Sequence, residues 1–209
     1  MPGSKTDEQP QPPALTRCMI LPPTFYARPT LTVARELLGA CLVRLVDGVR
    51  LAGIILETEA YIGENDLGCH AKSGKTRRNA VMYGPPGHAY VYFTYGMHWC
   101  LNAVTEAEGF PAAVLIRAIL PTEGLEIIHK RRNGRDTLGP AKVTQALAID
   151  GGLNGVNLTE PSSGLWIESG LPVSGESVTV GPRVGLYTVP EPWKSIPWRF
   201  QVVDHSKFR

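Results

Sequence analysis

Residues 57–102, ETEAYIGENDLGCHAKSGKTRRNAVMYGPPGHAYVYFTYGMHWCLN, contain the features from which the fold and the site can be predicted. The stretch begins with two carboxylates and a tyrosine at the end of a strand-like run. It continues through a cationic loop and ends in an aromatic hairpin. If the first strand extends far enough, Glu57, Glu59 and Tyr61 share one face, because side chains alternate along a strand. This combination indicates chemistry on a flat, anionic partner.

The segments around this stretch predict a single α+β domain. Asp47-Gly48 is a two-residue hairpin signal between β-rich runs at 41–46 and 49–57. A second hairpin, 88–94 and 97–105, should turn at Tyr95-Gly96. Because the strands arrive as hairpins, we expect a mainly antiparallel sheet. Further strands are expected at 112–120, 165–168 and 178–180, helices at 31–38, 122–132 and 140–149, and a long loop at 62–87.

Particular residues mark some of the expected element ends. Thr30 or Thr32 could cap the first helix, and Gly39 should stop it. Pro140 suits the first turn of the last helix. At the N-terminus, the polar, Pro-rich residues 1–13 are expected to form a disordered tail, so that the folded domain covers residues 14–209.

Composition excludes several classes of protein. The 209 residues carry a net charge of +2, and no apolar run approaches the roughly 18 residues of a membrane helix. The four cysteines have no CxxC spacing, which favours a reduced, intracellular protein without a metal site. We therefore expect no membrane partner, no metal and no cofactor.

Charge is distributed unevenly along the chain. Two basic groups can bind phosphates, although each could also be ordinary solvated surface. The first group follows the acids of the opening stretch, and the second comes later, at and after the end of a predicted helix: Lys72, Lys75, Arg77 and Arg78, then Lys130, Arg131, Arg132 and Arg135.

Glu57 and Glu59 are acids flanked by apolar and aromatic residues. Such a carboxylate can act as a general base on a water molecule. The alternative is that one or both simply pair with Arg117 or a nearby lysine. Arg117 lies inside an almost wholly apolar strand, so it needs a partner in either case.

The aromatic residues fall into different expected roles. Tyr95 stands at the hairpin tip, where an exposed ring could wedge between stacked bases. Tyr61 and His70 could form stacking walls for a planar ring, and Asn102 could be a buried amide that selects hydrogen bonds. Lys142, in the first turn of a predicted helix, could bind a phosphate together with free backbone N–H groups.

Taken together, these motifs resemble the 3-methyladenine (alkyladenine) DNA glycosylase family. The similarity runs from about Arg28 to Phe200 in the family's order. The matching motifs are Glu57-Thr58-Glu59-Ala60-Tyr61, Arg78-Asn79, Tyr90-Val91-Tyr92, Tyr95-Gly96-Met97, Asn102, Leu115-Ile116-Arg117-Ala118, Gly139-Pro140-Ala141-Lys142, Gln145-Ala146-Leu147 and Arg183-Val184-Gly185.

The resemblance implies a monomeric base-excision-repair enzyme with a curved sheet, flanking helices and a protruding hairpin that inserts into DNA. Its partner would be double-stranded DNA that contains alkylated or deaminated purines, namely 3-methyladenine, 7-methylguanine, hypoxanthine or ethenoadenine. The enzyme would flip the damaged base out, hydrolyse its N-glycosidic bond and leave an abasic site. It would work inside the cell, in the cytoplasm or nucleoid of a bacterium or the nucleus of a eukaryote.

The resemblance also assigns roles to single residues. Glu59 would be the general base, and Arg117 would help to hold the attacking water and the acid. The remaining implied roles are base-pocket residues Tyr61, His70, Tyr92 and Asn102, with Asn102 excluding guanine; the intercalating residue Tyr95; and the backbone or groove contacts Arg78, Tyr90, Met97 and Lys142.

The sequence departs from the family pattern at Cys69, at His98 and in the short loop 72–78. These positions border the expected site, so they concern the range of lesions rather than the reaction class. Two other functions remain open at this point. One is a non-catalytic nucleic-acid-binding module of the same fold. The other is a sugar glycosidase that uses Glu57 and Glu59, which leaves the cationic loop and Tyr95 unexplained.

Overall fold

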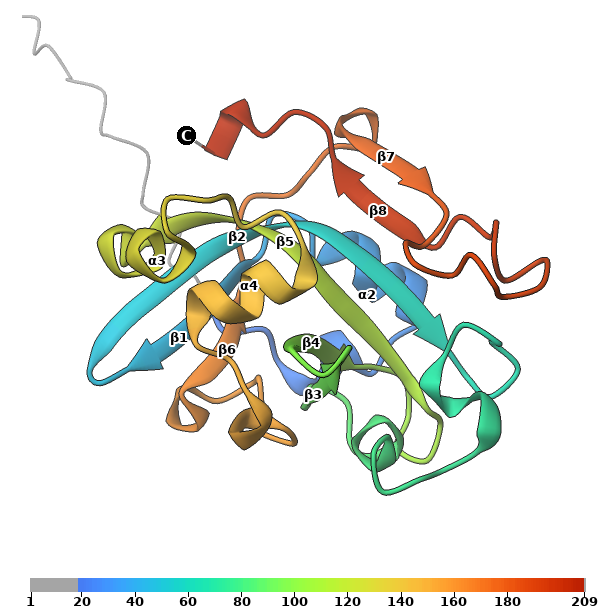
Figure 1. The fold of residues 1–209 in the computed structure, drawn as a ribbon. Helices are drawn as coiled ribbons and strands as arrows, with labels where there is room; N and C mark the ends of the chain where they lie inside the picture. Colours follow the sequence, from blue (N-terminus) through green and yellow to red (C-terminus); the bar gives the residue numbers. More distant parts are fainter. Residues whose placement is uncertain (1–18, 209) are drawn as a thin grey trace, which may run out of the picture.

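Two long, curved strands, β2 (Val49–Ile62) and β5 (Ala112–Glu123), run side by side through the centre of the molecule (Figure 1). The computed structural model describes residues 19–208, so the predicted tail at 1–13 lies outside the described residues. Within these residues the other strands are β1 (Cys41–Val46), β3 (Ala89–Thr94), β4 (His98–Val104), β6 (Leu165–Glu168), β7 (Val178–Gly181) and β8 (Arg199–Val202). The α-helices are α1 (Pro23–Tyr26), α2 (Thr30–Glu36), α3 (Leu125–Arg132) and α4 (Pro140–Leu147).

The described strands form one sheet in the order β3-β4-β5-β2-β1-β6, and every pairing is antiparallel. β8 adds to β2 at residues 57–59, beyond the end of β1, and β7 pairs with β8. One edge of β2 is therefore shared by two strands from opposite ends of the chain. The α+β class and the mainly antiparallel sheet expected from the sequence are confirmed.

Both predicted hairpin turns are confirmed. Asp47 and Gly48 have φ values of 51° and 77°, and Tyr95 and Gly96 have φ values of 51° and 67°. Paired positive φ angles match the right-handed twist of the flanking strands, and this conformation favours Asp and Gly. Tyr95 adopts it despite its bulk, which places the ring at the tip of the β3–β4 hairpin.

The β2–β5 register is irregular around Glu57. Ile55 pairs with Ile119, Glu57 with Ala118, and Thr58 with Ile116. Consequently Leu56 and Arg117 have no residue directly opposite. Such irregularities bend a strand and redirect its side chains, and they are common beside functional sites.

α2 and α4 pack on the long strands from the two sides of the sheet (Figure 1). The buried hydroxyl of Thr58 donates a hydrogen bond of 2.7 Å to the carbonyl of Ala34 in α2, which shows that Thr58 faces this helix. Glu57 and Glu59 therefore point to the other face, as the alternation along the strand predicted. On the α4 side, Thr144 donates to the carbonyl of Trp99 at 2.9 Å.

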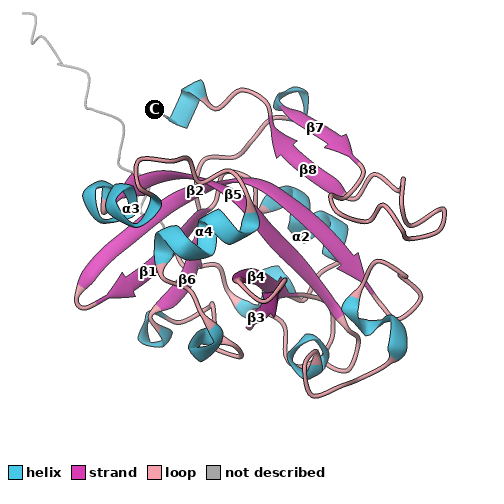
Figure 2. Ribbon diagram, in the orientation of Figure 1, coloured by secondary structure: helices cyan, strands magenta, loops and turns pink. Residues whose placement is uncertain are grey.

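Several predicted boundaries are corrected. The helix expected at 122–132 begins only at Leu125, because β5 continues through Pro121 to Glu123. The loop expected at 62–87 contains short 3₁₀ helices at His70–Ser73 and Ala80–Tyr83, and β8 and α1 were not predicted. Residues 182–198, between β7 and β8, form a long loop (Figure 2).

The predicted threonine cap of α2 is wrong. Pro29 occupies the N-cap position, and Thr30 is the first helical residue. Instead, Glu106 supplies the missing acceptor, because its carboxylate receives both the backbone N–H and the hydroxyl of Thr30 at 2.8 Å. Gly39, the predicted stop, follows the helix with a φ of 86°, and a side chain there would collide with the carbonyl of Leu171.

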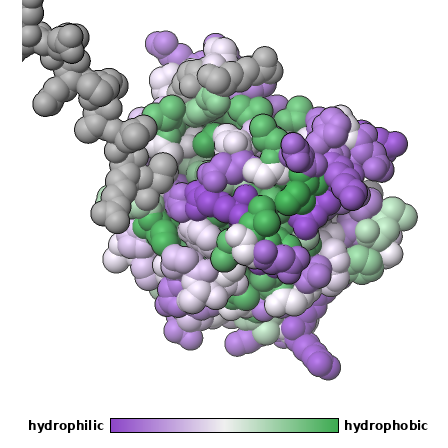
Figure 3. All heavy atoms as spheres, turned by 90° about the vertical axis from the view of Figure 1, so that its left-hand side faces the viewer, coloured by the Kyte–Doolittle hydropathy of each residue, from purple (hydrophilic) through white to green (hydrophobic). Residues whose placement is uncertain are grey.

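The surface on the β1–β2 hairpin side mixes hydrophilic and hydrophobic residues, with apolar groups in separate small areas (Figure 3). Among residues 19–208, no helix is both long and apolar enough to cross a membrane.

The carboxylate cap of α2 can be tested by substitution. Glu106→Ala should lower the free energy of unfolding by about 1–2 kcal/mol, because it leaves a helix N–H without its acceptor. Glu106→Gln keeps an acceptor oxygen and should lose less. Urea unfolding measures both values, with exposed Glu108→Ala as the control. Equal stability of Glu106→Ala and Glu108→Ala would contradict this role.

Candidate active site

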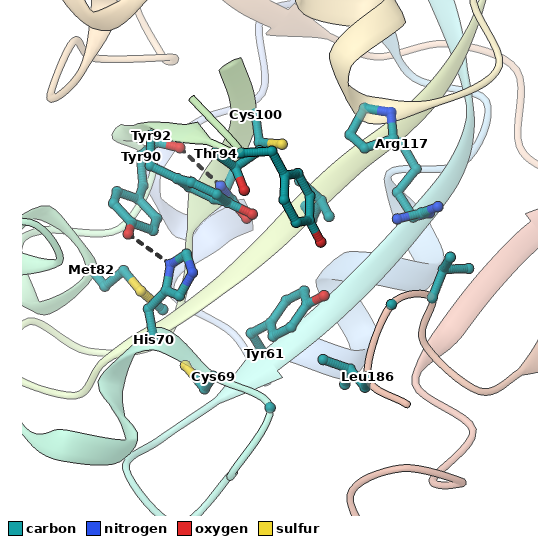
Figure 4. Close-up of a pocket in the computed structure, with 17 residues that line it drawn as sticks. Tyr61, Cys69, His70, Met82, Tyr90, Tyr92, Thr94, Cys100, Arg117 and Leu186 are labelled. Carbon is teal, nitrogen blue, oxygen red and sulfur yellow. Dashed lines mark hydrogen bonds between the residues drawn. The ribbon is translucent and has the colours of Figure 1, made fainter. Parts of the chain in front are cut away.

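An aromatic pocket of about 320 Å³ opens between the β3–β4 hairpin, the C-terminal end of β2, the N-terminal half of β5 and the loop 182–198. Figure 4 shows the side chains of Tyr61, His70, Tyr92 and Arg117 pointing toward its interior. The lining includes seven of the predicted site residues: Tyr61, His70, Tyr90, Tyr92, Tyr95, Asn102 and Arg117. Other lining residues had no role predicted from the sequence: Met82, Thr94, Cys100, Val184 and Leu186.

Glu59 lies immediately behind this pocket. Its side chain is 0% exposed, and one of its oxygens accepts the backbone N–H of Val184 at 2.7 Å. The other oxygen accepts the hydroxyl of Tyr61 at 2.9 Å and an N–H of Arg117 at 3.4 Å. All three donor residues line the pocket, so the carboxylate is separated from it only by the groups that hold it.

Burial raises the pKa of Glu59 above its ordinary value. The positive charge of Arg117 and the hydrogen bonds from Val184 and Tyr61 oppose this effect, because they stabilise the ionised form. The nearby negative charge of Glu57 raises the pKa further. The site thus holds a carboxylate whose affinity for a proton is stronger than that of an exposed glutamate.

Glu57 has a different environment. One of its oxygens accepts from Arg117 at 2.9 Å and from Arg199 of β8 at 3.2 Å. This pairing with arginine is the alternative to a catalytic role that the sequence left open. Arg117 has the partners that its burial requires, and Glu57 fixes the orientation of its guanidinium beside Glu59.

The walls of the pocket are aromatic, and ring contacts and hydrogen bonds join their side chains to one another. The Tyr92 ring meets His70 edge to face, with 4.5 Å between centroids, and lies 5.3 Å from the ring of Tyr90. The hydroxyl of Tyr90 is 2.9 Å from Nδ1 of His70. Asn102 is 3% exposed, and its amide donates to the carbonyl of Tyr90 at 2.9 Å, which fixes the orientation of the amide.

Most wall groups are uncharged near neutral pH. Burial against the other rings, with the positive charges of Arg78 and Lys72, lowers the pKa of His70 to about 4. Burial raises the pKa of Tyr90 to about 12 and the pKa of Cys69 to about 11. Neutral walls of this kind adjoin the charged guanidinium of Arg117, with Glu59 directly behind it.

The hairpin tip is exposed. Tyr95 is 83% exposed and Met97 is 67% exposed. Arg78 of the cationic loop braces the hairpin, because its guanidinium donates to the carbonyl of Phe93 at 3.0 Å and lies 5.5 Å from the ring centre of Tyr92.

The remaining predicted contacts lie in two different places. Met97 and Lys142 border a separate open groove beside the hairpin, where the ammonium of Lys142 is 2.8 Å from Asp136. Tyr90 is only 1% exposed and belongs to the pocket wall, so its side chain is not where a contact to a DNA backbone was expected. Its alternation with Tyr92 along β3 is the signal that places both rings on one face.

Among residues 19–208, no group of three or more His, Cys, Asp and Glu side chains could hold a metal ion. The contact from Val184 to Glu59 was missed by reasoning from the residues, because the two lie 125 residues apart and a backbone N–H carries no sequence signature.

Comparison with known proteins gives a consistent result. Residues 24–206 match the family described as methylpurine-DNA glycosylase. A protein of Carboxydothermus hydrogenoformans named "Putative 3-methyladenine DNA glycosylase" is 53% identical over 192 residues, which cover 90% of this chain and 97% of the relative. Proteins with the same name from Methanocella arvoryzae (50% identical; 87% of this chain, 91% of the relative) and Myxococcus xanthus (49% identical; 88% and 90%) are also similar.

The burial of Glu59 and the hydrogen bonds to its carboxylate predict how the carboxyl titrates. Its pKa should lie above the ordinary value of about 4.3. Tyr61→Phe should raise it further, because the lost hydroxyl bond favours the charged form. Carbon-13 NMR of the labelled carboxyl measures both titrations. Tyr26→Phe is the matched control, because the Tyr26 hydroxyl is buried without a hydrogen-bond partner. An identical titration in wild type and Tyr61→Phe would refute the expected coupling.

Proposed function

The chain belongs to the methylpurine-DNA glycosylase family, and on this premise we propose that Glu59 activates the water that releases a damaged purine from DNA. The protein is a DNA-repair enzyme that hydrolyses an N-glycosidic bond. The observation that carries the proposal is the buried carboxylate held by Val184, Tyr61 and Arg117 at the base of an aromatic pocket. The reaction leaves a free base and an abasic site.

The geometry of Glu59 suits a general base. An ionised carboxylate has about four acceptor positions, and three are used by the donors described above. One remains for a water molecule, which would give its proton to the carboxylate as it attacks C1′ of the nucleotide. Arg117 supports this step, because its charge keeps Glu59 ionised and its guanidinium reaches the pocket.

The pocket walls indicate the class of base. N-alkylation at positions such as N3 of adenine or N7 of guanine makes the purine cationic and a better leaving group. Faces of Tyr61 and Tyr92 attract such a ring through cation–π interactions, and neutral His70 does not repel it. We propose the substrates to be 3-methyladenine, 7-methylguanine, hypoxanthine and ethenoadenine, with the fixed amide of Asn102 excluding guanine by a clash with its exocyclic amine.

A base must leave the helix to enter this pocket. Flipping costs a few kcal/mol and is easiest for damaged pairs. Exposed Tyr95 at the hairpin tip is the side chain that would fill the gap in the stack. Arg78 lies against the hairpin, and Met97 and Lys142 border the neighbouring groove. All three would contact the backbone or the groove of DNA, with Lys142 exchanging Asp136 for a phosphate.

The protein would act as a monomer on chromosomal DNA inside the cell. A non-catalytic module of the same fold would need none of the donors that orient Glu59. A sugar glycosidase would need a second free carboxylate, but Glu57 is bound by two arginines. A base-release assay on alkylated, deaminated and etheno-modified duplexes distinguishes these functions and gives the preferred lesions.

Glu59→Gln should keep duplex binding but reduce base release by about 10²–10⁴-fold, because the amide cannot accept the proton of the water. Single-turnover release from a 7-methylguanine duplex measures the rate, and a gel-shift assay measures binding. Glu57→Gln is the matched control and should lose less activity, because Glu57 is bound by two arginines and is not the proposed acceptor of the water proton. Near-normal release by Glu59→Gln would sink the proposal.

Tyr95→Ala should weaken binding to abasic-site DNA by about 1–3 kcal/mol, since it removes an aromatic ring from the stack. Fluorescence anisotropy with a labelled duplex measures this loss. Leu45→Ala, an exposed apolar residue in the other hairpin, is the control and should bind like the wild type. Unchanged binding by Tyr95→Ala argues against its insertion.

A further inference from the structure

A fully buried ion pair, Asp66–Arg183, lies beside the site and takes no part in the mechanism above. Both side chains are 0% exposed, and the guanidinium meets the carboxylate through two N–H groups, one of them at 2.7 Å. The same guanidinium lies 4.7 Å from the ring centre of Tyr61 and 5.1 Å from that of Trp198. It is therefore held between two aromatic rings and one acid.

This ion pair is connected to the backbone of three segments. Arg183 donates to the carbonyl of Ala60 in β2 at 3.0 Å and to the carbonyl of Trp193 at 3.3 Å. Asp66 accepts the backbone N–H of Gly68 at 2.9 Å. The pair thus joins the central strand, the loop after it and the loop 182–198.

Arg183 also lies next to two of the groups that hold Glu59. Val184 directly follows Arg183 in the chain, and its N–H makes the 2.7 Å bond to the Glu59 carboxylate. Ala60 directly follows Glu59. Tyr61, whose ring lies against Arg183, donates its hydroxyl to the same carboxylate. A shift of Arg183 would therefore displace two of the three donors to the base.

The space around the pair leaves little freedom. A side-chain carbon at Gly68 would come within 2.9 Å of the Arg183 guanidinium and 2.6 Å of the Leu186 side chain. Leu186 lines the aromatic pocket. The pair, Gly68 and the pocket wall are consequently packed as one unit.

We propose that Arg183, fixed by Asp66 and by the rings of Tyr61 and Trp198, is a positioning residue that sets the Val184 N–H and the Tyr61 hydroxyl on the catalytic carboxylate. Arg183 does not line the pocket and touches no reacting atom. Its effect on the reaction passes through the two donors. This inference rests on the proposed role of Glu59.

A positioning role differs from a purely stabilising one in its effect on pH dependence. Base release should rise with pH as Glu59 ionises, because only the carboxylate can accept the water proton. The groups that face Glu59 are Glu57 and Tyr61 of β2, Arg117 of β5, and Tyr92 and Cys100 of the β3–β4 hairpin. Displacement of the Val184 N–H removes a hydrogen bond to ionised Glu59 and so raises the pKa of Glu59. The low-pH part of the pH–rate profile, its acidic limb, then moves to higher pH.

Arg183→Lys tests this role, because lysine keeps a charge for Asp66 but cannot reproduce the two-pronged contact or the stacking. The acidic limb of single-turnover release should move up by about one pH unit, which is about a tenfold lower rate below the limb. Rates should approach the wild-type value at high pH, and binding to abasic-site DNA should stay within about threefold, since no DNA contact is removed.

Arg50→Lys is the matched control. Arg50 makes the same two-pronged contact, at 2.9 and 2.8 Å, with Glu168 and lies over the ring of Trp166, but it belongs to the far end of β2. Its variant should leave the acidic limb in place even where it lowers thermal stability. An equal shift in Arg50→Lys and Arg183→Lys would overturn the proposal.

A folded Arg183→Lys variant with a wild-type pH profile would also overturn it. If this variant does not fold, Asp66→Asn provides the same measurement, because it removes one charge and leaves the guanidinium between its rings. If the acidic limb of Asp66→Asn stays at the wild-type pH, the proposal is likewise overturned. Glu59→Gln is run beside them: its normal turnover would instead refute the proposed function, whatever the Arg183 variants show.

Discussion

A carboxylate without access to solvent must be held by donors inside the protein, and Glu59 imposes this requirement on the whole molecule. Removing a charge from water costs several kcal/mol unless hydrogen bonds and an opposite charge replace the water. The donors here come from β2, from β5 and from the loop between β7 and β8. The sheet order, in which β2 lies between β5 and the β1/β8 edge, is what brings these three segments together.

The charged groups and the neutral aromatic walls occupy different parts of the site. Its walls, including His70 and the tyrosines, are neutral near pH 7, whereas the ionic groups gather at one end around Arg117. In the proposed reaction, the walls would select the damaged base by ring contact and by its charge, and Glu59 and Arg117 would act at one end of the pocket. The irregular register at Glu57 serves this separation, since it turns Arg117 out of the regular ladder and toward both acids.

Local patterns in the sequence predicted the parts of the structure that depend on neighbouring residues. Alternation along β2 placed Glu57, Glu59 and Tyr61 on one face, the two turn dipeptides located both hairpins, and an arginine in an apolar strand required an acidic partner. The end of β5 was misjudged because Pro121 usually ends a strand. Here Pro121 lies opposite Gly53 at a register shift, where a missing N–H is tolerated.

Contacts between distant segments could not be predicted in the same way. Glu106 caps the N-terminus of α2, and the backbone N–H of Val184 bonds to the Glu59 carboxylate. Neither contact can be predicted from the local sequence. The wall position of Tyr90 was predictable, because Tyr90 and Tyr92 alternate with Val91, and their cross-strand partners are Asn102 and Cys100. The resemblance to a family predicted the reaction, whereas the structure identifies the hydrogen-bond donors that hold Glu59.

The sharing of one β2 edge by β1 and β8 has a consequence for biosynthesis. β1 and β2 are synthesised well before the loop that contains Val184 and the strand β8, because they precede both in the chain. A nascent chain that ends before Val184 has Glu59 without one of its donors, and its central strand has an open edge that can pair with other chains. Residues 182–202 must therefore be synthesised and must fold onto β2 before the sheet edge and the hydrogen bonds of Glu59 are complete.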